Sequence, residues 1–400
     1  MNAVASPPTR DEVLGVLAQV IDPELGADIV TLGMVPGVEV AADGLVTVTI
    51  KLTIGGCPLR ADIKRDVIGR VGLHPGVREV RIEWGEMNAA ERADTMSKAR
   101  WNARSNAPTT EIPATCRVIA VASGKGGVGK SSVTVNLATA LAAHGHTVGV
   151  LDADIWGFSV PRLLGMSERL AAERVDGSDK PRIIPNTKAV GTGLLKVVST
   201  GFLVDEETAL MWRGLMLTKA VEQFLADVSW GHLDYLLIDM PPGTGDVQMG
   251  LARLLPRTAM LIVTTPARAA QKVAQRAADM ALRSFLPVLG VVENMSAFQC
   301  AHGESYALFG EGGGLALAEA IGAPLLGQIP IEPAVAAGND AGTPVALDGQ
   351  SPAAESFRAI AARLVELTPP QVAAPVDMAG CSARLLERVE LALGPKPAAG

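Results

Sequence analysis

The segment Gly124–Ser131 constrains the possible folds of this chain more than any other segment. It reads Gly-Lys-Gly-Gly-Val-Gly-Lys-Ser and fits the pattern G-x-x-x-x-G-K-[ST]. A strand-like apolar run, Arg117–Ala122, precedes it, and a helical run, Ser131–Ala143, follows it. In this context, glycines let backbone N–H groups converge on phosphate oxygens at the positive end of a helix. The pattern predicts a nucleotide-binding P-loop, and the alternative is a glycine-rich turn without a ligand.

The chain around this loop alternates between strand-like and helical runs. The strand-like runs are Arg117–Ala122, Thr147–Leu151, Tyr235–Asp239, Ala259–Thr265, Val288–Glu293 and Leu325–Ile329. The helical runs include Ser131–Ala143, Leu217–Val228, Ala267–Arg283 and Pro352–Leu367. Alternation on this scale predicts an α/β fold, a mostly parallel sheet flanked by helices as in P-loop NTPases.

A chain of 400 residues is longer than most single domains, so we expect two. Residues 1–86 combine two helical runs with short alternating strands, which predicts a small α+β domain. Residues 87–115 are polar and are interpreted as a linker that is helical in part. Residues 116–368 form the predicted P-loop domain, and residues 369–400 form a flexible tail.

Composition excludes several classes of protein. Hydrophobic residues make up 48% of the chain and charged residues 19%, as in ordinary globular proteins. No apolar stretch approaches the roughly 20 residues of a membrane-spanning helix, and no secretory signal is visible at the N-terminus. The net charge of −7 argues against nucleic acid as a partner. Four scattered cysteines do not form a disulfide framework. We therefore expect a cytoplasmic protein that binds neither membrane nor nucleic acid.

The loop and three strand ends supply the candidate site residues. Lys130 is expected to reach the β- and γ-phosphates as a catalytic residue, and Ser131 to bind Mg²⁺. The predicted nucleotide-binding set is Gly124, Lys125, Gly126, Gly127, Val128, Gly129, Lys130, Ser131, Ser132, Gly243 and Asn294. Asn294 is expected to end a strand, where its amide would read the adenine edge; an amide that satisfies a local turn is the alternative.

Carboxylates lie at the carboxyl ends of two of the strand-like runs, where ligands of open α/β sheets bind. Asp239 is expected to hold Mg²⁺ through water. Asp154 is the predicted catalytic residue that orients or deprotonates the attacking water. Asp152 lies two residues earlier, and a helix cap is the alternative interpretation for it. The N–H of Gly243 is expected to contact the γ-phosphate and so to sense hydrolysis.

Lys125 gives the loop a second lysine. In this respect it resembles the deviant Walker A motif of the MinD, Mrp and nitrogenase-iron-protein class. That resemblance implies a homodimer in which Lys125 acts as a catalytic residue on the partner's ATP. A solvated loop lysine is the alternative interpretation.

Further segments are similar to the Mrp/ApbC family of iron–sulfur cluster carrier ATPases. They are Ser123–Ser131, Asp152–Gly157, Met211–Gly214, Trp230–Tyr235, Asp239–Asp246, Glu293–Ser296 and Phe309–Gly314. The N-terminal unit resembles SufT/PaaD-like domains in Asp22–Glu24 and Thr53–Pro58. Together the two resemblances cover about four-fifths of the chain. They imply ATP, Mg²⁺ and an iron–sulfur cluster as ligands, with apoproteins and assembly factors as partners.

One departure from the family bears on the cluster. The family carries Cys-x-x-Cys after the Asn-Met-Ser segment, whereas here Cys300 is followed by Ala301, His302 and Gly303. A cluster in a symmetric dimer would then have two thiolates, and His302 is a candidate for the missing pair. The alternative is that Cys300 is a lone thiol and no bridging cluster forms. Cys57 precedes a helical run, so it is either a second cluster or metal ligand or a structural cysteine.

Two functions compete. The first is an iron–sulfur carrier whose slow ATP hydrolysis is coupled to cluster transfer. The second is a MinD/ParA-like positioning ATPase on membrane or DNA, which needs a basic amphipathic helix or patch. The charges of Ser382–Leu393 cancel, which favours the carrier. An electron donor with a four-thiolate cluster and a regulatory nucleotide-binding module without turnover are the weaker alternatives.

Overall fold

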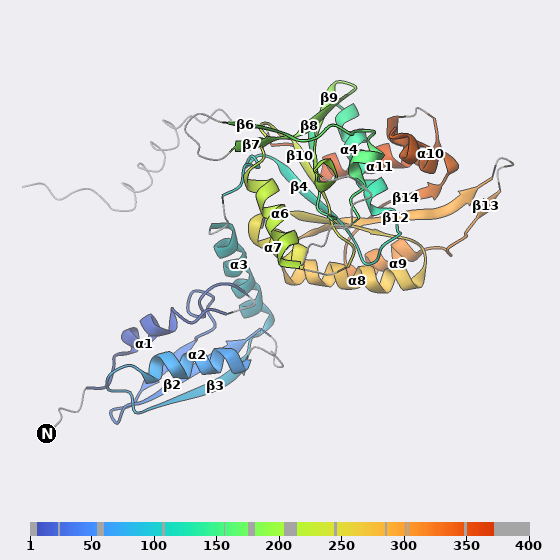
Figure 1. Cartoon of the computed structure of the whole chain (residues 1–400). Coiled ribbons are helices and arrows are strands. Elements are labelled where there is room, and N and C mark those ends of the chain that lie inside the picture. The colour runs from blue at the N-terminus through green and yellow to red at the C-terminus, as the bar shows by residue number, and fades with distance from the viewer. Residues whose placement is uncertain are drawn as a thin grey trace, which may run out of the picture.

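The computed structural model describes most of the chain. It covers residues 6–22, 25–53, 60–105, 109–155, 157–174, 181–203, 214–243, 246–284, 286–300, 302, 304–347 and 350–371. Figure 1 shows a small unit of helices and strands in the N-terminal part and a larger α/β unit after it. Among the described residues, no helix combines the length and the apolar composition that crossing a membrane requires.

The small unit is an α+β arrangement, as predicted. Its three strands, β1 (Gly37–Val40), β2 (Leu45–Leu52) and β3 (Glu79–Glu86), lie in the order β1-β2-β3. Every second residue of β2 is buried, so one face of this sheet is packed. The helices α1 (Arg10–Leu17) and α2 (Arg60–Gly72) bury Val13, Leu17, Ile63 and Val67 in the same core as that face.

Helix α3 (Ala89–Ser105) lies in the predicted linker. Its Ala99 is buried in the core of the small unit, and the Thr95 hydroxyl donates to the Leu32 carbonyl at 3.0 Å. Lys51 on β2 pairs with Glu91 on this helix at 2.6 Å. The first part of the linker thus packs as a part of the small unit, and the division at residue 86 stays a proposal.

The large unit is built on a mostly parallel sheet, which confirms the predicted fold. Its order is β13-β12-β11-β4-β10-β5-β9-β8, with β14 paired to β12. Only the pairs β8–β9 and β12–β13 are antiparallel among its described strands. The strands are β4 (Arg117–Ser123), β5 (Thr147–Asp152), β8 (Asn186–Val190), β9 (Gly193–Ser199), β10 (Tyr235–Asp239), β11 (Ala259–Thr264), β12 (Val288–Gln299), β13 (Ser305–Tyr306) and β14 (Leu325–Ile331).

Helices cover both faces of this sheet (Figure 1). Side chains of β4 alternate between the two cores, with Ile119 and Val121 in one and Val118 and Ala120 in the other. The first core is shared with α4 (Lys130–Ala143) and α11 (Pro352–Leu367), and the second with α6 (Gly214–Ala226), α7 (Asp246–Leu254), α8 (Arg268–Arg283) and α9 (Gly313–Ile321). Burial on both faces explains why the central strands are continuous apolar runs.

Shorter elements complete the described structure: α5 (Val160–Leu163), β6 (Ala171–Arg174), β7 (Pro181–Ile184), α10 (Pro333–Ala341) and the 3₁₀ turns Thr200–Phe202 and Val345–Leu347. Strand β12 is longer than predicted, because pairing continues past Glu293 to a hairpin with β13. Asn294 therefore lies within the strand and not at its predicted end.

Candidate functional site

The P-loop joins the carboxyl end of β4 to the first turn of α4. Gly129 caps α4 with a φ of 79°, a left-handed conformation that favours glycine. Gly124 lies against the backbone of α8: a Cβ at this position would be 2.2 Å from the Ala274 nitrogen. The two glycines therefore allow the turn and the close packing that place the loop at the end of the sheet.

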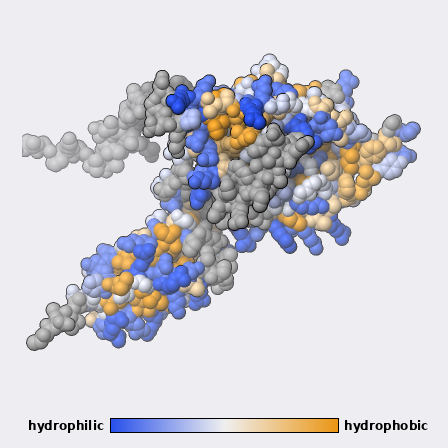
Figure 2. Space-filling model, viewed as in Figure 1, coloured by the Kyte–Doolittle hydropathy of each residue, from blue (hydrophilic) through white to orange (hydrophobic). Residues whose placement is uncertain are grey.

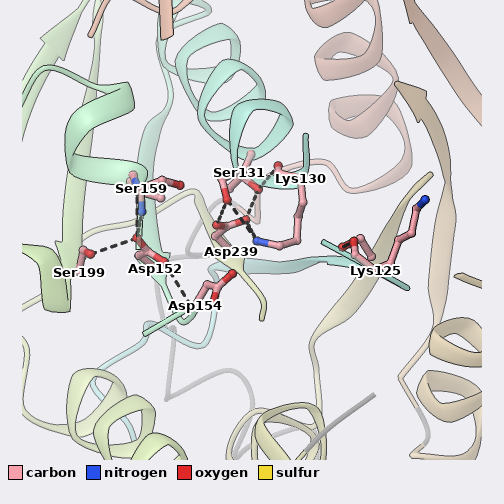
Figure 3. A network of polar contacts seen from close by, with 11 residues as sticks. Lys125, Lys130, Ser131, Asp152, Asp154, Ser159, Ser199 and Asp239 are labelled. Carbon is pink, nitrogen blue, oxygen red and sulfur yellow. Dashed lines mark hydrogen bonds and ion pairs between the residues drawn. The ribbon is translucent and has the colours of Figure 1, made fainter. Parts of the chain in front are cut away.

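Lys130, Ser131 and Asp239 converge at this edge (Figure 3). The Lys130 Nζ lies 2.6 Å from Asp239 Oδ1, and the Ser131 hydroxyl donates to Asp239 Oδ2 at 2.5 Å. The Thr134 hydroxyl also donates to Asp239 Oδ1, at 2.9 Å. The Lys130 side chain is 6% exposed and that of Asp239 is fully buried, so this ion pair is held in a desolvated position. Sequence patterns did not point to Thr134, although it lies one helical turn after Lys130.

Asp152 is buried at the end of β5 and accepts four hydrogen bonds. Its donors are the backbone N–H groups of Asp154, Ser159 and Val160 and the hydroxyl of Ser199. Since Ser159 is the N-cap of α5, the capping interpretation of Asp152 is supported. Burial raises the pKa of the Asp152 carboxyl to about 7; Asp239 adds to the rise and Lys130 opposes it.

Asp154 lies in the loop after β5, and Figure 3 shows it in the same group of polar side chains as Asp239. Its side chain is partly buried, and this burial raises the pKa of its carboxyl above the ordinary aspartate value. Lys130 opposes the rise and Asp239 adds to it. Because Lys130 and Asp239 both influence its titration, Asp154 shares the electrostatic environment of this ion pair.

The arrangement fits a nucleotide phosphate with Mg²⁺. A Cβ at Gly126 or Gly127 would meet no atom within 4 Å, so the loop is unobstructed at these two positions. A hydroxyl and a carboxylate, Ser131 and Asp239, supply the hard oxygen donors that Mg²⁺ prefers. In the described ranges, no group of three or more His, Cys, Asp or Glu side chains is arranged to hold a metal ion. Water and phosphate oxygens would therefore complete the coordination of Mg²⁺.

Two other predicted loop residues point elsewhere. The Lys125 side chain is exposed and extends away from the Lys130–Asp239 pair (Figure 3), while its carbonyl accepts the Ser123 hydroxyl at 3.1 Å. Ser132 faces α10, where its hydroxyl accepts the Asn339 amide at 3.0 Å. The fold therefore leaves the Lys125 ammonium free of the site formed by its own chain.

Gly243 and Asn294 both form hydrogen bonds within the protein. The Gly243 N–H donates to the Ser123 carbonyl at 2.9 Å, so contact with a γ-phosphate would require this bond to break. The Asn294 amide donates to the Val128 carbonyl at 2.9 Å and is buried. Asn294 thus braces the P-loop from β12, a role that its sequence context did not indicate. Contact with adenine stays a prediction for it.

Glu293 is a buried carboxylate that sequence patterns did not single out as a site residue. It accepts the Gly314 N–H at the start of α9 and the Gln328 amide of β14 at 2.6 Å. The sequence feature that could have identified Glu293 is its position as an acidic residue at the end of an apolar run, directly before Asn294. Glu293 therefore ties α9 and β14 to the strand that braces the loop.

Cys300 follows β12 in the turn of the β12–β13 hairpin (Figure 1), and because β12 runs parallel to β11 and β4, this hairpin extends from the same edge of the sheet as the P-loop. It is a free, partly exposed cysteine, and its N–H donates to the Glu304 carbonyl at 2.9 Å. His302 is exposed. Figure 2 shows apolar surface near this hairpin, where Tyr306, Leu308 and Phe309 are 46%, 61% and 48% exposed. Cys57, the other predicted ligand, lies outside the described residues.

Comparisons with known proteins agree with this geometry. A family described as NUBPL iron-transfer P-loop NTPase matches residues 114–365, and one described as iron-sulfur cluster assembly protein matches residues 10–84. The iron-sulfur cluster carrier protein of Mycobacterium tuberculosis is 45% identical over 338 residues, 83% of this chain and 86% of its own. That of Deinococcus radiodurans is 42% identical over 357 residues, 89% and 94% of the two chains.

One solved structure is similar to a large part of this chain. It is a nucleotide-binding protein from Archaeoglobus fulgidus in complex with ADP, 37% identical with a TM-score of 0.50. The match covers 60% of this chain and 91% of that one. With a family match over more than half of its length, this chain belongs to the NUBPL family of iron-transfer P-loop NTPases.

Proposed function

We propose that this chain is an iron–sulfur cluster carrier that binds and hydrolyses ATP and passes clusters to apoproteins. One observation carries the proposal: an iron-transfer P-loop NTPase and an iron–sulfur assembly unit occur in one chain, and the first has its phosphate-binding groups assembled. The curated relatives named iron-sulfur cluster carrier protein support it. They favour the carrier over the positioning ATPase.

Different residues at the end of the sheet bind the phosphates and the Mg²⁺ of MgATP. The loop N–H groups and Lys130 bind the phosphates, and Ser131 and Asp239 hold Mg²⁺. When bound, Mg²⁺ neutralises phosphate charge that develops during transfer. Lys130 now pairs with Asp239 at 2.6 Å, so an incoming phosphate competes with that carboxylate for the ammonium. The pair thus holds the lysine in position before the nucleotide arrives.

Asp154 is proposed to orient and deprotonate the attacking water. A general base works best when its pKa lies near the working pH, and burial shifts the pKa of Asp154 in that direction. Asp152 holds the loop that carries it, through the Asp154 N–H at 3.2 Å. The loop that carries the proposed catalytic carboxylate of Asp154 is therefore anchored by the fully buried carboxylate of Asp152.

Lys125 is proposed to act on the nucleotide of a second copy of the chain. Its exposed side chain extends away from its own Lys130 and Asp239, which is consistent with a role in trans. Exposed apolar side chains on the β12–β13 hairpin and the segment after it, Tyr306, Leu308 and Phe309, are of the kind that a partner covers. The proposed working form is a homodimer whose turnover is slow and coupled to cluster transfer.

The cargo cluster is proposed to lie between the two copies, bound by Cys300 of each. His302, exposed two residues further on, is the candidate for the remaining ligands, since imidazole replaces thiolate in some [2Fe–2S] sites. A lone Cys300 without a bridging cluster is the alternative, and Cys57 is the second candidate thiol. Recipient apoproteins and assembly factors are the proposed partners. A cytoplasmic location and the lack of membrane or nucleic-acid partners stay predictions.

Anaerobic reconstitution with iron and sulfide tests the cargo proposal. The wild-type chain is expected to acquire thiolate-to-iron charge-transfer absorbance and stoichiometric iron and sulfide. The Cys300→Ala variant should acquire neither, whereas Cys116→Ala, which removes a buried thiol, should behave as wild type. No cluster on the wild type, or the same cluster on Cys300→Ala, would refute the role of Cys300. Phosphate release from ATP, measured in parallel, tests the ATPase independently.

A further inference from the structure

A cleft of about 560 Å³ lies at the edge of the large sheet opposite the P-loop. Its lining includes Arg117 and Val118, where β4 begins, and Ala259, where β11 begins. Leu254, at the end of α7, and Arg257, three residues after it, also line the cleft. Since β4 ends at Ser123, just before the P-loop, the strand separates this cleft from the nucleotide site. Its volume is within the range of small-molecule sites.

Two arginines line this cleft, and no acidic residue of the described chain pairs with either of them. Arg257 uses Nη2 to donate to the carbonyls of Ile112 and Pro113, both at 2.9 Å, while its Nε is buried and has no hydrogen-bond partner in the described structure. Arg117 donates through Nε to the Pro369 carbonyl at 2.8 Å. Neither arginine forms an ion pair with a described residue, and no Asp or Glu lines the cleft.

A buried guanidinium N–H without an acceptor destabilises the folded state, because it has lost its hydrogen bond to water and has not formed another. Burial also lowers the pKa of Arg257, which reflects the same loss of hydration. An anion in the cleft would supply both the missing acceptor and the missing charge. Carboxylates match the planar fork of an arginine well.

Much of the remaining lining is apolar, although Thr110, Thr368 and Gln371 add polar groups. The apolar side chains include Val118, Leu254, Pro287 and Leu289. We infer that this cleft binds a small organic carboxylate, whose anionic head contacts Arg257 and Arg117 and whose apolar body packs on these side chains. Thr110, Ala114 and Cys116, from the segment that joins the small unit to the large one, form part of the lining. A bound ligand would therefore fasten this segment to the base of the sheet.

Calorimetric titration of the full-length chain tests the inference, with octanoate as the probe. Octanol and acetate carry the apolar body and the carboxylate separately, so each is expected to bind at least tenfold more weakly than octanoate. Arg257→Met should weaken octanoate binding about tenfold or more, the scale of one charge-assisted hydrogen bond. Arg253→Met, which removes an exposed arginine one turn earlier in α7, should leave it unchanged.

Arg257 also holds two carbonyls, so its variant can lose binding through a change of fold. Ala114→Trp provides the second test, because Ala114 is exposed at the cleft and a large side chain there fills it while both arginines are retained. It should abolish octanoate binding while the circular dichroism spectrum and the ATPase activity remain those of wild type. Absence of octanoate binding to the wild type, equal binding of octanol, or wild-type binding by Ala114→Trp would overturn the inference.

Discussion

At the scale of single residues, Asp154 is the side chain on which the proposed hydrolysis depends most directly. Asp154→Asn removes the base and keeps the shape, so ATP binding should persist while kcat falls by about 10²–10⁴-fold. The activity of the wild type requires the ionised carboxylate. Since burial raises its pKa, the activity should begin to fall at a higher pH than the ordinary aspartate value of about 3.9 predicts.

Steady-state phosphate release from pH 5 to 9, with nucleotide binding measured separately, checks this prediction. Asp279→Asn is a suitable control, because Asp279 is exposed on α8 and pairs with Arg283 on the surface. It should leave both the rate and its pH dependence unchanged. An Asp154→Asn variant with wild-type kcat would assign the base elsewhere.

Cys116 and Cys300 are expected to differ in reactivity. Burial raises the pKa of Cys116 to about 12, so its thiolate is scarce at pH 8.5, and the side chain is also shielded from reagents. Cys300 is partly exposed at the hairpin tip. Iodoacetamide labelling at pH 8.5, mapped by peptide mass spectrometry, should modify Cys300 in the native chain and Cys116 only after unfolding. Equal labelling of the two in the native chain would contradict the buried position of Cys116.

At the scale of elements, the contact between the P-loop and β12 is open to a matched test. Gly127 and Gly129 both have positive φ, so alanine at either position costs about 1 kcal/mol in backbone strain. A Cβ at Gly129 would also lie 2.2 Å from the Asn294 amide, whereas one at Gly127 meets open space. Gly129→Ala should therefore lower the free energy of unfolding by about 1–3 kcal/mol more than Gly127→Ala, the cost of a lost buried hydrogen bond.

Urea unfolding of the two variants beside wild type measures this difference. Equal destabilisation by both would show that Asn294 adjusts without losing its bond to Val128. The comparison also bears on nucleotide binding, since Asn294 can contact adenine only if its amide is released from that bond.

The sequence predicts best the elements whose own residues carry a recognisable pattern. Strand β10 is Tyr235–Asp239 as predicted, because a strand buried on both faces is a continuous apolar run. Strand β12 extends past Glu293 because Phe298 and Gln299 pair with β13, and Met295 within it takes a positive φ. Neither feature leaves a local signal in the sequence. The convergence of Lys130, Ser131 and Asp239 follows from parallel strand ends. The contact of Asp152 with Ser199 depends on a distant strand pairing that periodicity does not reveal.

At the scale of the whole molecule, the side chains proposed for ATP hydrolysis point in two different directions. Lys130, Ser131, Asp154 and Asp239 gather at the end of the sheet, while the exposed Lys125 extends away from them. A chain that uses Lys125 in catalysis must therefore either reorganise its own loop or meet a second copy. The two possibilities differ in whether two inactive variants can restore one another.

Mixing Lys125→Ala with Asp154→Asn separates these possibilities. If Lys125 acts in trans, each mixed dimer holds one complete site, in which the Lys125→Ala chain supplies Asp154 and its partner supplies Lys125. Random exchange makes half of the dimers mixed, so phosphate release should recover to about a quarter of the wild-type rate. If Lys125 acts within its own chain, both sites of a mixed dimer lack one residue and the mixture stays inactive. Since each variant alone should be inactive, recovered activity can arise only from a site shared between two chains.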